Sequence, residues 1–390
     1  MRFRRFGVPE PARPPTPIPS PHPRSLTFYA RALADPSGCD LIDEDALNDV
    51  LARLEAAGRP LAESPGGSAA NVAKCFARLA NSRKKRTTTT RRKMTKTKPD
   101  AKTTALVYFA GTLGNDDCGR QYRKAMEATG VAMSHASVHG TESNGVCLCL
   151  VTESGERTMR TALRASKTHE LVQGTIDGVR PDWAHFEGYY VYKPTILETM
   201  ERLKGAGAKI SFDFASFDVI ASQRDLFERV LDRRLIDVLF CNEQEAVAFS
   251  SSSASSASSD PFDPSDPSEN RAAALSPAAF AKHMAGAYGL TMVVSRGASG
   301  CVAAAWDHGR GCVVEASAPA PTVEVVDTIG AGDHFSAGFL YALSHGGSLE
   351  AACACGCIAG AAAVQVAGSN VDGEAMRRAA RDIADRLKTG

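Results

Sequence analysis

The chain has 390 residues, of which 44% are hydrophobic, and carries a formal net charge of +1 at neutral pH. These values suit one or two globular domains and exclude a fibrous or wholly disordered chain. No apolar run reaches the roughly 18 residues that a membrane-spanning helix needs, so no membrane partner is expected.

The first 38 residues are predicted to be a disordered, proline-rich segment. Prolines recur at close intervals up to residue 23, and proline neither continues a helix nor pairs inside a sheet. A cytoplasmic protein with a disordered tail is expected. A plastid or mitochondrial targeting segment is one alternative, and a wrongly assigned start of the gene is another.

Residues 39–390 are predicted to form one domain in which strands alternate with helices. The expected strands are 105–110, 145–152, 183–186, 208–213, 236–240, 291–295 and 301–305. The expected helices are 71–80, 117–129, 194–206, 276–287, 335–345, 349–366 and 373–387. This alternation indicates an α/β protein with a mostly parallel central sheet and helices on both faces. Within 131–162, however, the runs 135–139, 145–151 and 157–161 indicate consecutive antiparallel strands.

Two segments, 82–104 and 250–278, interrupt this pattern and are expected to be disordered insertions. The first carries nine lysines and arginines between Arg83 and Lys98. A nuclear signal or a nucleic-acid patch is the alternative interpretation. No nucleic-acid partner is expected, because the segment contains no aromatic side chain that would stack on bases.

Eleven cysteines are present, and none forms a Cys-x-x-Cys pair. Cys353, Cys355 and Cys357 lie at spacings that do not share one face of a helix. Small buried thiols in a reducing compartment are therefore expected, with a zinc site as the alternative.

The most informative segment is the glycine-rich turn Asp327-Thr328-Ile329-Gly330-Ala331-Gly332-Asp333. It follows an apolar, strand-like run and opens a helical one. Glycines let backbone N–H groups approach a ligand, and the start of a helix favours bound anions. Asp333 beside such a site can accept the proton of a hydroxyl group. The turn therefore indicates phosphoryl transfer to an alcohol, with a simple N-cap aspartate as the alternative.

Three further segments follow candidate strands or open helices. They are Pro65-Gly66-Gly67-Ser68-Ala69-Ala70-Asn71, Asn242-Glu243-Gln244-Glu245 and Ser295-Arg296-Gly297-Ala298-Ser299-Gly300. Open α/β sheets bind ligands at the carboxyl ends of their strands, so these segments are expected to converge on one edge.

In this order, the four segments resemble the ribokinase-like (PfkB) family of carbohydrate and nucleoside kinases over residues 39–386. The stretch 145–160 looks like plant and algal carbohydrate kinases of this family and like adenosine-kinase-like members. The resemblance implies a ribokinase-like fold with a β-sheet lid within 131–162. It also implies an ATP-dependent phosphotransferase, monomeric or homodimeric, whose small-molecule acceptor is a sugar or a nucleoside.

By resemblance, Asp333 is the general base, and the N–H groups of Gly330, Ala331 and Gly332 hold the transferred phosphoryl group. The substrate would contact Gly66, Gly67 and Asn71, whose alternative role is a tight turn. The nucleotide would contact Ser295, Gly297, Gly300 and Asn242, which otherwise form ordinary turns.

The expected cofactors are ATP and Mg²⁺. Asn242 and Glu245 match a family motif that organises Mg²⁺ through water, although the same pair also fits a helix capping box. Asp327, with carbonyl groups near Ala363 and Gly368, lies where some relatives bind a monovalent cation, so K⁺ is a further candidate. Asp213 is a weaker candidate for the metal network. Arg157 and Arg160 are expected to pair across strands, with phosphate contact as the alternative.

Most members of this family begin with a strand whose aspartate binds sugar hydroxyls, and no such pattern precedes Cys39. The N-terminal strand is therefore expected to be missing, the chain to be poorly soluble and its activity weak. A sugar kinase is the leading interpretation, and an adenosine or nucleoside kinase the second, because no pocket for a base is identifiable. A non-catalytic interaction protein is a third, against which the intact turn at Gly330–Asp333 argues.

Overall fold

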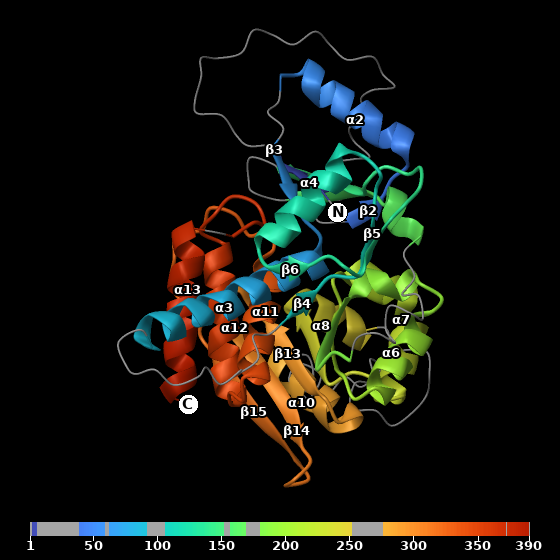
Figure 1. The fold of residues 1–390 in the computed structure, drawn as a ribbon. Coiled ribbons are helices and arrows are strands. Elements are labelled where there is room, and N and C mark those ends of the chain that lie inside the picture. Colours follow the sequence, from blue (N-terminus) through green and yellow to red (C-terminus); the bar gives the residue numbers. More distant parts are fainter. Residues whose placement is uncertain are drawn as a thin grey trace, which may run out of the picture. The chain divides into compact units, whose positions relative to one another are not determined.

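The computed structural model describes residues 2–5, 39–58, 62–91, 106–151, 157–168, 180–251, 276–371 and 373–389. The chain divides into two compact units, whose elements are labelled in Figure 1. The first unit comprises residues 1–67, 111–125 and 136–169. The second comprises residues 68–110, 126–135 and 170–390.

A six-stranded sheet forms the centre of the second unit. Its strands lie in the order β10 (Trp183–Glu187), β11 (Lys209–Asp213), β12 (Val238–Asn242), β13 (Thr291–Ser295), β14 (Cys301–Asp307) and β15 (Cys312–Ala318). The first four strands are parallel, whereas β14 and β15 are antiparallel to their neighbours. The prediction of an α/β fold with a mostly parallel central sheet is confirmed.

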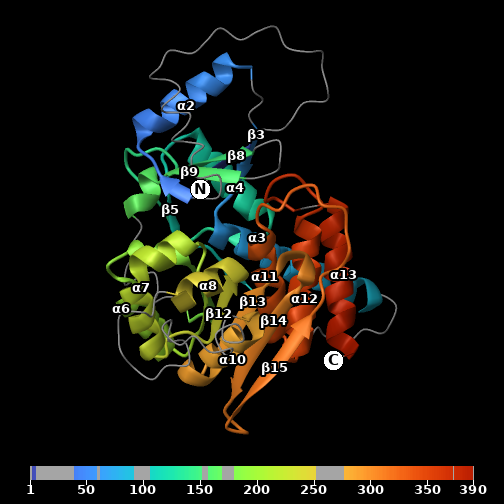
Figure 2. The same cartoon turned by 180° about the vertical axis from the view of Figure 1, so that it is seen from behind.

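Helices cover both faces of this sheet. One layer consists of α6 (Ile196–Gly205), α7 (Phe217–Asp232), α8 (Glu243–Ser251) and α10 (Pro277–Tyr288). The other consists of α3 (Ser68–Arg91), α11 (Ala331–Ser344), α12 (Leu349–Ala363) and α13 (Gly373–Thr389). Figure 1 shows the red helices of the second layer and the green α6 and α7 of the first on opposite sides of the strands, and Figure 2 shows the same arrangement from behind.

The central strand β12 supplies side chains to both layers. Leu239 and Cys241 lie in the core beneath α6, α7, α8 and α10. Val238 and Phe240 lie in the core beneath α3, α11 and α12. Side chains alternate between the faces of a strand, and a strand that is covered on both faces is apolar throughout, as β12 is.

Helices α11 and α12 pack through small residues. A Cβ atom on Gly338 of α11 would lie 2.5 Å from the carbonyl oxygen of Cys355 and 2.7 Å from Cβ of Ala359, both in α12. A Cβ atom on Gly356 would lie 2.8 Å from the ring of Phe335. The Gly/Ala/Cys-rich sequence of α12 therefore permits a close approach of the two helices.

A five-stranded sheet forms the first unit. Its order is β2 (Cys39–Leu41), β9 (Arg157–Ala162), β8 (Val146–Val151), β1 (Arg2–Arg5) and β3 (Ala62–Pro65). The expected hairpin of β8 and β9 is present and antiparallel. The expectation that no strand precedes Cys39 is corrected, because β1 pairs with both β8 and β3. Four residues are too few to show an alternating pattern, so backbone pairing identifies this strand where the sequence does not.

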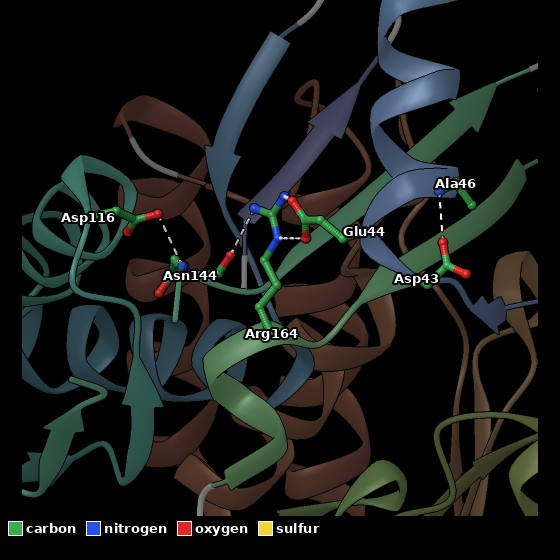
Figure 3. Close-up of polar contacts among 6 residues, drawn as sticks. All are labelled: Asp43, Glu44, Ala46, Asp116, Asn144 and Arg164. Atoms are coloured by element: carbon green, nitrogen blue, oxygen red, sulfur yellow. Dashed lines mark hydrogen bonds and ion pairs between the residues drawn. The ribbon is translucent and has the colours of Figure 1, made fainter. Parts of the chain in front are cut away.

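Helix α2 (Glu44–Ala56) packs its Leu47 against Val146, Leu148 and Ala162 of this sheet. Its first turn is capped by Asp43, which accepts a hydrogen bond from the N–H of Ala46 at 2.8 Å (Figure 3). The Arg164 guanidinium pairs with the Glu44 carboxylate, which lowers the pKa of Glu44. Because Glu44 is half exposed, we expect this pair to contribute little to stability.

A second set of contacts in Figure 3 links the loops of the first unit. Arg164 also donates to the carbonyl oxygen of Asn144 at 3.3 Å. The N–H of Asn144 donates to Asp116 at 3.1 Å, and Asn144 in turn accepts from the N–H of Gly114 at 3.0 Å. Asp116 also accepts from the N–H of Gly119 at the start of α4 (Asp117–Ala128). This network holds together the three loops that contain Asp116, Asn144 and Arg164.

Three further expectations differ from the structure. Helix α3 continues to Arg91, so the first ten residues of the expected insertion 82–104 are helical, and residues 92–104 lie outside the described residues. Strand β7 (Ala136–Val138) pairs in parallel with β5 (Gly111–Leu113) rather than with β8. Of the insertion 250–278, residues 252–275 lie outside the described residues.

The remaining short strands, β4 (Val107–Tyr108) and β6 (Val131–Ala132), pair in parallel within the second unit. In the part of the chain that the structure describes, no helix combines the length and the hydropathy needed to cross a membrane.

Candidate functional site

The carboxyl ends of four neighbouring strands of the second unit carry polar side chains. Glu187 ends β10 and lies in register with Asp213 at the end of β11. Asn242 ends β12 and lies in register with Ser295 at the end of β13. Adjacent parallel strands place such residues at one edge of the sheet, as the sequence predicted for Asn242 and Ser295.

The glycine-rich turn opens α11 within the same unit. Gly330 has a φ of 75°, in the left-handed region that favours glycine, and forms the N-cap of the helix. Phe335 and Phe339 then pack on Phe240 of β12, with ring centroids 6.4 and 5.5 Å apart. These contacts fix the first turn of α11, and with it Asp333, against the central strand.

Two side chains of α3 hold the Asp333 carboxylate. The Ser68 hydroxyl donates to Oδ1 at 2.7 Å, and the Asn71 amide donates to Oδ2 at 2.7 Å. Asn71 is 1% exposed, and its Oδ1 has no hydrogen-bond partner among the described residues. The structure thus brings Asn71 and Asp333 together, as expected, and adds Ser68 as an orienting residue.

Burial raises the pKa of Asp333, and the hydrogen bonds from Asn71 and Ser68 and the charge of Lys74 oppose this rise. The pKa of Glu187 is raised to about 7 by burial and by the charge of Asp333. The pKa of Asp213 is also raised, by burial and then by Glu245. The negative charge of each of these carboxyl groups therefore disfavours the ionisation of the others. A cation bound beside them would favour their ionised forms.

The N–H groups of the turn are not equivalent. The N–H of Ala331 donates to the carbonyl oxygen of Thr328 at 3.2 Å, so it is engaged within the turn. The N–H groups of Gly332 and Asp333, in the first turn of α11, have no acceptor within their own helix because of helix geometry. A Cβ atom on Gly332 would meet no described atom within 4 Å. An anion could therefore approach this side of the turn.

Asn242 and Glu245 form a capping box at the start of α8. The N–H and the side-chain amide of Asn242 donate to the two oxygens of Glu245 at 2.9 and 2.8 Å. The N–H of Glu245 donates back to Asn242 Oδ1 at 2.9 Å. Glu245 is 5% exposed, and burial raises its pKa to about 7. The structure therefore shows the helix-cap arrangement of this pair.

The segment Ser295–Gly300 forms a compact turn after β13. Gly297 and Gly300 have φ values of 54° and 84°, and the N–H of Arg296 donates to the carbonyl oxygen of Gly300 at 2.8 Å. A Cβ atom on Gly300 would lie 2.0 Å from the Ala318 carbonyl oxygen, so this glycine is needed for packing. A Cβ atom on Gly297 meets no described atom within 4 Å, which leaves its outer side accessible.

Asp327 links two loops of the second unit. It is 3% exposed, and its oxygens accept from the N–H of Ile329 at 3.1 Å and from the N–H of Gly368 at 2.6 Å. Its own N–H donates to Val364 at 3.1 Å. Asp327 and the Gly368 segment are thus adjacent, but the carboxylate already accepts two backbone bonds.

Gly66, Gly67 and Arg160 belong to the first unit. The Gly66 carbonyl oxygen accepts a bond from the Tyr122 hydroxyl at 3.1 Å, and Gly67 has a φ of 103°. Arg160 is 6% exposed and donates to the carbonyl oxygen of Met159, its neighbour in the same strand, at 3.0 Å. The side chain of Arg157 lies outside the described residues.

The described cysteines are free thiols, including the buried Cys353, Cys355 and Cys357. Cys301 of β14 and Cys357 of α12 have sulfur atoms 3.7 Å apart. Within the described ranges, no three His, Cys, Asp or Glu side chains converge as metal ligands would.

Three residues near Asp333 were not found from the sequence. Glu187 could have been found as a carboxylate that ends a strand, by the reasoning applied to Asp213. Ser68 could have been found as a hydroxyl at the start of the helix that carries Asn71. Lys74 gives no such signal, because a lysine in a helix is ordinarily exposed.

The sequence of this chain is similar to those of kinases. The family model for pfkB family carbohydrate kinases matches residues 42–375. The chain is 26% identical to a fructokinase of Salmonella typhimurium over 313 residues, which cover 78% of the chain and 83% of the relative. It is 26% identical to adenosine kinase 1 of Arabidopsis thaliana over 271 residues, covering 67% and 72%.

Solved structures show the same fold. A probable sugar kinase from Rhizobium etli matches with a TM-score of 0.68 at 24% identity, covering 92% of this chain and 93% of that one. Adenosine kinase from Sinorhizobium meliloti matches with a TM-score of 0.69 at 22% identity, with the same coverage. These likenesses establish a ribokinase-like fold.

Because the family model spans most of its length, the chain belongs to the PfkB family of carbohydrate kinases. It is thus a phosphotransferase of the class that acts on an alcohol group of a sugar or a nucleoside.

Proposed function

We propose that this protein is an ATP-dependent kinase that transfers the γ-phosphoryl group to a primary hydroxyl of a sugar. The observation that carries this proposal is Asp333, a partly buried carboxylate at the start of α11 that is oriented by Ser68 and Asn71. Both carboxylate oxygens accept a hydrogen bond, so the group is held in one orientation before a substrate arrives.

In the proposed reaction, Asp333 accepts the proton of the substrate hydroxyl while that oxygen attacks the γ-phosphorus. The bond between the γ-phosphorus and the bridging oxygen breaks, and ADP leaves. The N–H groups of Gly332 and Asp333 support the transferred oxygens, because they lie at the positive end of α11. The N–H group of Gly330 would extend this cradle, and that of Ala331 would join it only if its bond to Thr328 opens.

The nucleotide is assigned to the turn Ser295–Gly300 and to Asn242, on the neighbouring strand ends. Gly297 supports this assignment, since its outer side is open to a ligand. The substrate is assigned to Asn71, with Gly66 and Gly67 as further contacts from the resemblance to the family.

Magnesium fits the donor groups at the ends of β11 and β12. The raised pKa values of Asp213 and Glu245 indicate uncompensated carboxyl groups, and Mg²⁺ is usually held by one or two carboxylates and several waters. Because Glu245 caps α8 with both oxygens, we assign it and Asn242 to the water shell of the ion. Mg²⁺ bound there would neutralise charge on the phosphates.

A monovalent cation such as K⁺ is assigned to Asp327. The neighbouring Gly368 segment supports the location, whereas the two backbone bonds that Asp327 already accepts oppose it.

A nucleoside kinase is the second candidate function. The observation that favours it is that aminoimidazole riboside kinase and adenosine kinases match the chain at 25% to 27% identity, as closely as fructokinase does at 26%. Identity at this level does not select a substrate.

The deciding experiment is ADP release with Mg-ATP and a panel of fructose, ribose, aminoimidazole riboside and adenosine. The Asp333→Asn variant is the control for contaminating kinases. We expect one sugar to give turnover that the variant lacks. Turnover with adenosine alone would favour the nucleoside kinase, and no turnover with any acceptor would contradict both proposals.

Glu245→Gln is expected to raise the Mg²⁺ concentration for half-maximal rate by roughly tenfold or more, the usual effect of losing an outer-shell partner. In this variant the N–H of residue 245 still donates to Asn242, but its side chain has one oxygen instead of two to accept the bonds that Asn242 donates. A magnesium titration of the rate measures this effect. Glu243→Gln is the matched control, because Glu243 is half exposed and pairs with Arg296.

An unchanged magnesium titration, together with a lower melting temperature, would contradict the assignment. Glu245 would then act only as a cap of α8.

A further inference from the structure

Lys74 is a buried lysine that the proposed chemistry does not yet use. It lies on α3 and is 1% exposed. Lysine is almost never buried to this extent unless an opposite charge compensates it. Its position therefore requires a physical explanation.

The position of Lys74 on α3 relates it to Asp333. It follows Asn71 by three residues, and residues at this spacing are neighbours on one helix face. Asn71 donates to Asp333 at 2.7 Å, and α3 packs on α11. Lys74 thus shares with Asn71 the face of α3 that meets α11, the helix that carries Asp333.

The charges around Lys74 come from several elements. Burial and the charge of Arg78 lower its pKa to about 7, whereas Asp333 raises it. Arg78 lies one turn further along α3 and donates to Asn370 Oδ1 at 3.0 Å and to the Val371 carbonyl oxygen. Asp333 is therefore the first of the two groups that favour the charged form of Lys74, before the Cys75 thiol.

The other titratable groups named for Lys74 and Asp333 do not supply the positive charge that Lys74 supplies. Burial raises the pKa of Cys75 to about 12 and lowers that of His334 to about 4, so both are neutral at pH 7. Glu187 and Asp213 are acidic, and their charges favour the protonated form of Asp333. In the described part of the chain, Lys74 is the cation that lowers the pKa of Asp333.

We propose that Lys74 is a positioning residue whose ammonium group keeps the Asp333 carboxylate ionised and ready to accept the substrate proton. The role of Asp333 rests on the proposed function, but the coupling between the two charges does not. Coupling is reciprocal, so each charge must change the proton affinity of the other by the same factor.

The test compares Lys74→Met, which removes the charge at similar length, with Lys74→Arg, which keeps it. Lys282→Met is the control, because Lys282 is an exposed lysine that pairs with Glu315. The side-chain carboxyl carbon of Asp333 is followed by NMR through a pH titration without ligand, and Asp333→Asn assigns its signal. We expect Lys74→Met to raise the proton affinity of Asp333 roughly tenfold or more. Lys74→Arg and Lys282→Met should leave it near the wild-type value.

Two further measurements complete the design. The ε-carbon of Lys74 should titrate at lower pH in Asp333→Asn, which tests the coupling even if Lys74→Met does not fold. With any acceptor that the substrate panel identifies, the acid side of the kcat/KM profile should move to higher pH in Lys74→Met and be restored in Lys74→Arg.

Each outcome bears on one proposal. An unchanged titration of both groups would overturn the role of Lys74, whatever the activity. A shifted titration in a protein that phosphorylates no acceptor would support the coupling and contradict the proposed function.

Discussion

Asp333→Asn is expected to lower kcat by roughly 10²–10⁴, the usual contribution of a general base. The substitution removes the group that accepts the substrate proton and keeps nearly the same shape. The fold should be retained, because the free Oδ1 of Asn71 can accept from the new amide once the Asn71 side chain reverses. Steady-state rates and ATP binding by calorimetry measure these effects.

The same variant makes a prediction about pH. Burial raises the folded-state pKa of Asp333 above its ordinary value of 3.8. The contribution of Asp333 to stability is therefore fully present below pH 3.8 and is lost as the pH rises through the folded-state pKa. The melting temperature of Asp333→Asn should thus rise relative to the wild type as the pH increases. Retention of most activity by this variant would contradict the role of Asp333 as the base.

Gly338→Ala is expected to destabilise the protein by roughly 2–3 kcal/mol, the cost of overpacking a close contact. Alanine normally favours a helix by about 1 kcal/mol over glycine, so the expected effect has the opposite sign to the helix propensity. The new methyl group would lie 2.5 Å from a backbone oxygen of α12, which cannot move without shifting the helix. Urea denaturation followed by circular dichroism measures the change.

Gly332→Ala, in the same helix, is the matched control. Its methyl group would meet no described atom within 4 Å, so the denaturation midpoint should not fall. Its kcat should fall instead, because the methyl group lies where the proposed phosphoryl cradle is open. Equal denaturation midpoints for Gly338→Ala and the wild type would contradict the close packing of α11 on α12.

Much of the second unit could be predicted from the sequence. The strands at 183–187, 209–213 and 291–295 are short apolar runs between helical patterns. The first two differ from the prediction by one residue at one end, and the third matches it at both ends. The turn at Gly330 was predicted because glycine and a following apolar helix leave few alternatives. The convergence of Asn71 and Asp333 was expected because ligand-binding segments of open α/β sheets gather at the carboxyl ends of the strands. The structure has the Asn71 amide 2.7 Å from the Asp333 carboxylate.

Other elements were not predicted, for different physical reasons. Helix α2 has an N-cap at Asp43 and apolar residues at the helical spacing of Leu47, Val50, Leu51 and Leu54. Its sequence therefore contains a helix pattern from which α2 could have been predicted. Strand β1 consists mostly of arginines, and only its pairing with β8 and β3 reveals it. The burial of Lys74 depends on the packing of α3 against α11, which no local pattern encodes.

The pair Asn242 and Glu245 shows where sequence reasoning reaches its limit. A capping box and a magnesium motif require the same residue types at the same spacing. The structure shows the cap through three hydrogen bonds, whereas the role in ion binding stays a prediction.

The position of β12 has a consequence for how the second unit unfolds. Its alternate side chains belong to two different cores, so a shift of its pairing by one residue would move every side chain into the wrong layer. Neither helical layer can reach its native packing until this strand is in register. The two layers should therefore gain and lose structure together, as one cooperative transition, although they share no face of the sheet.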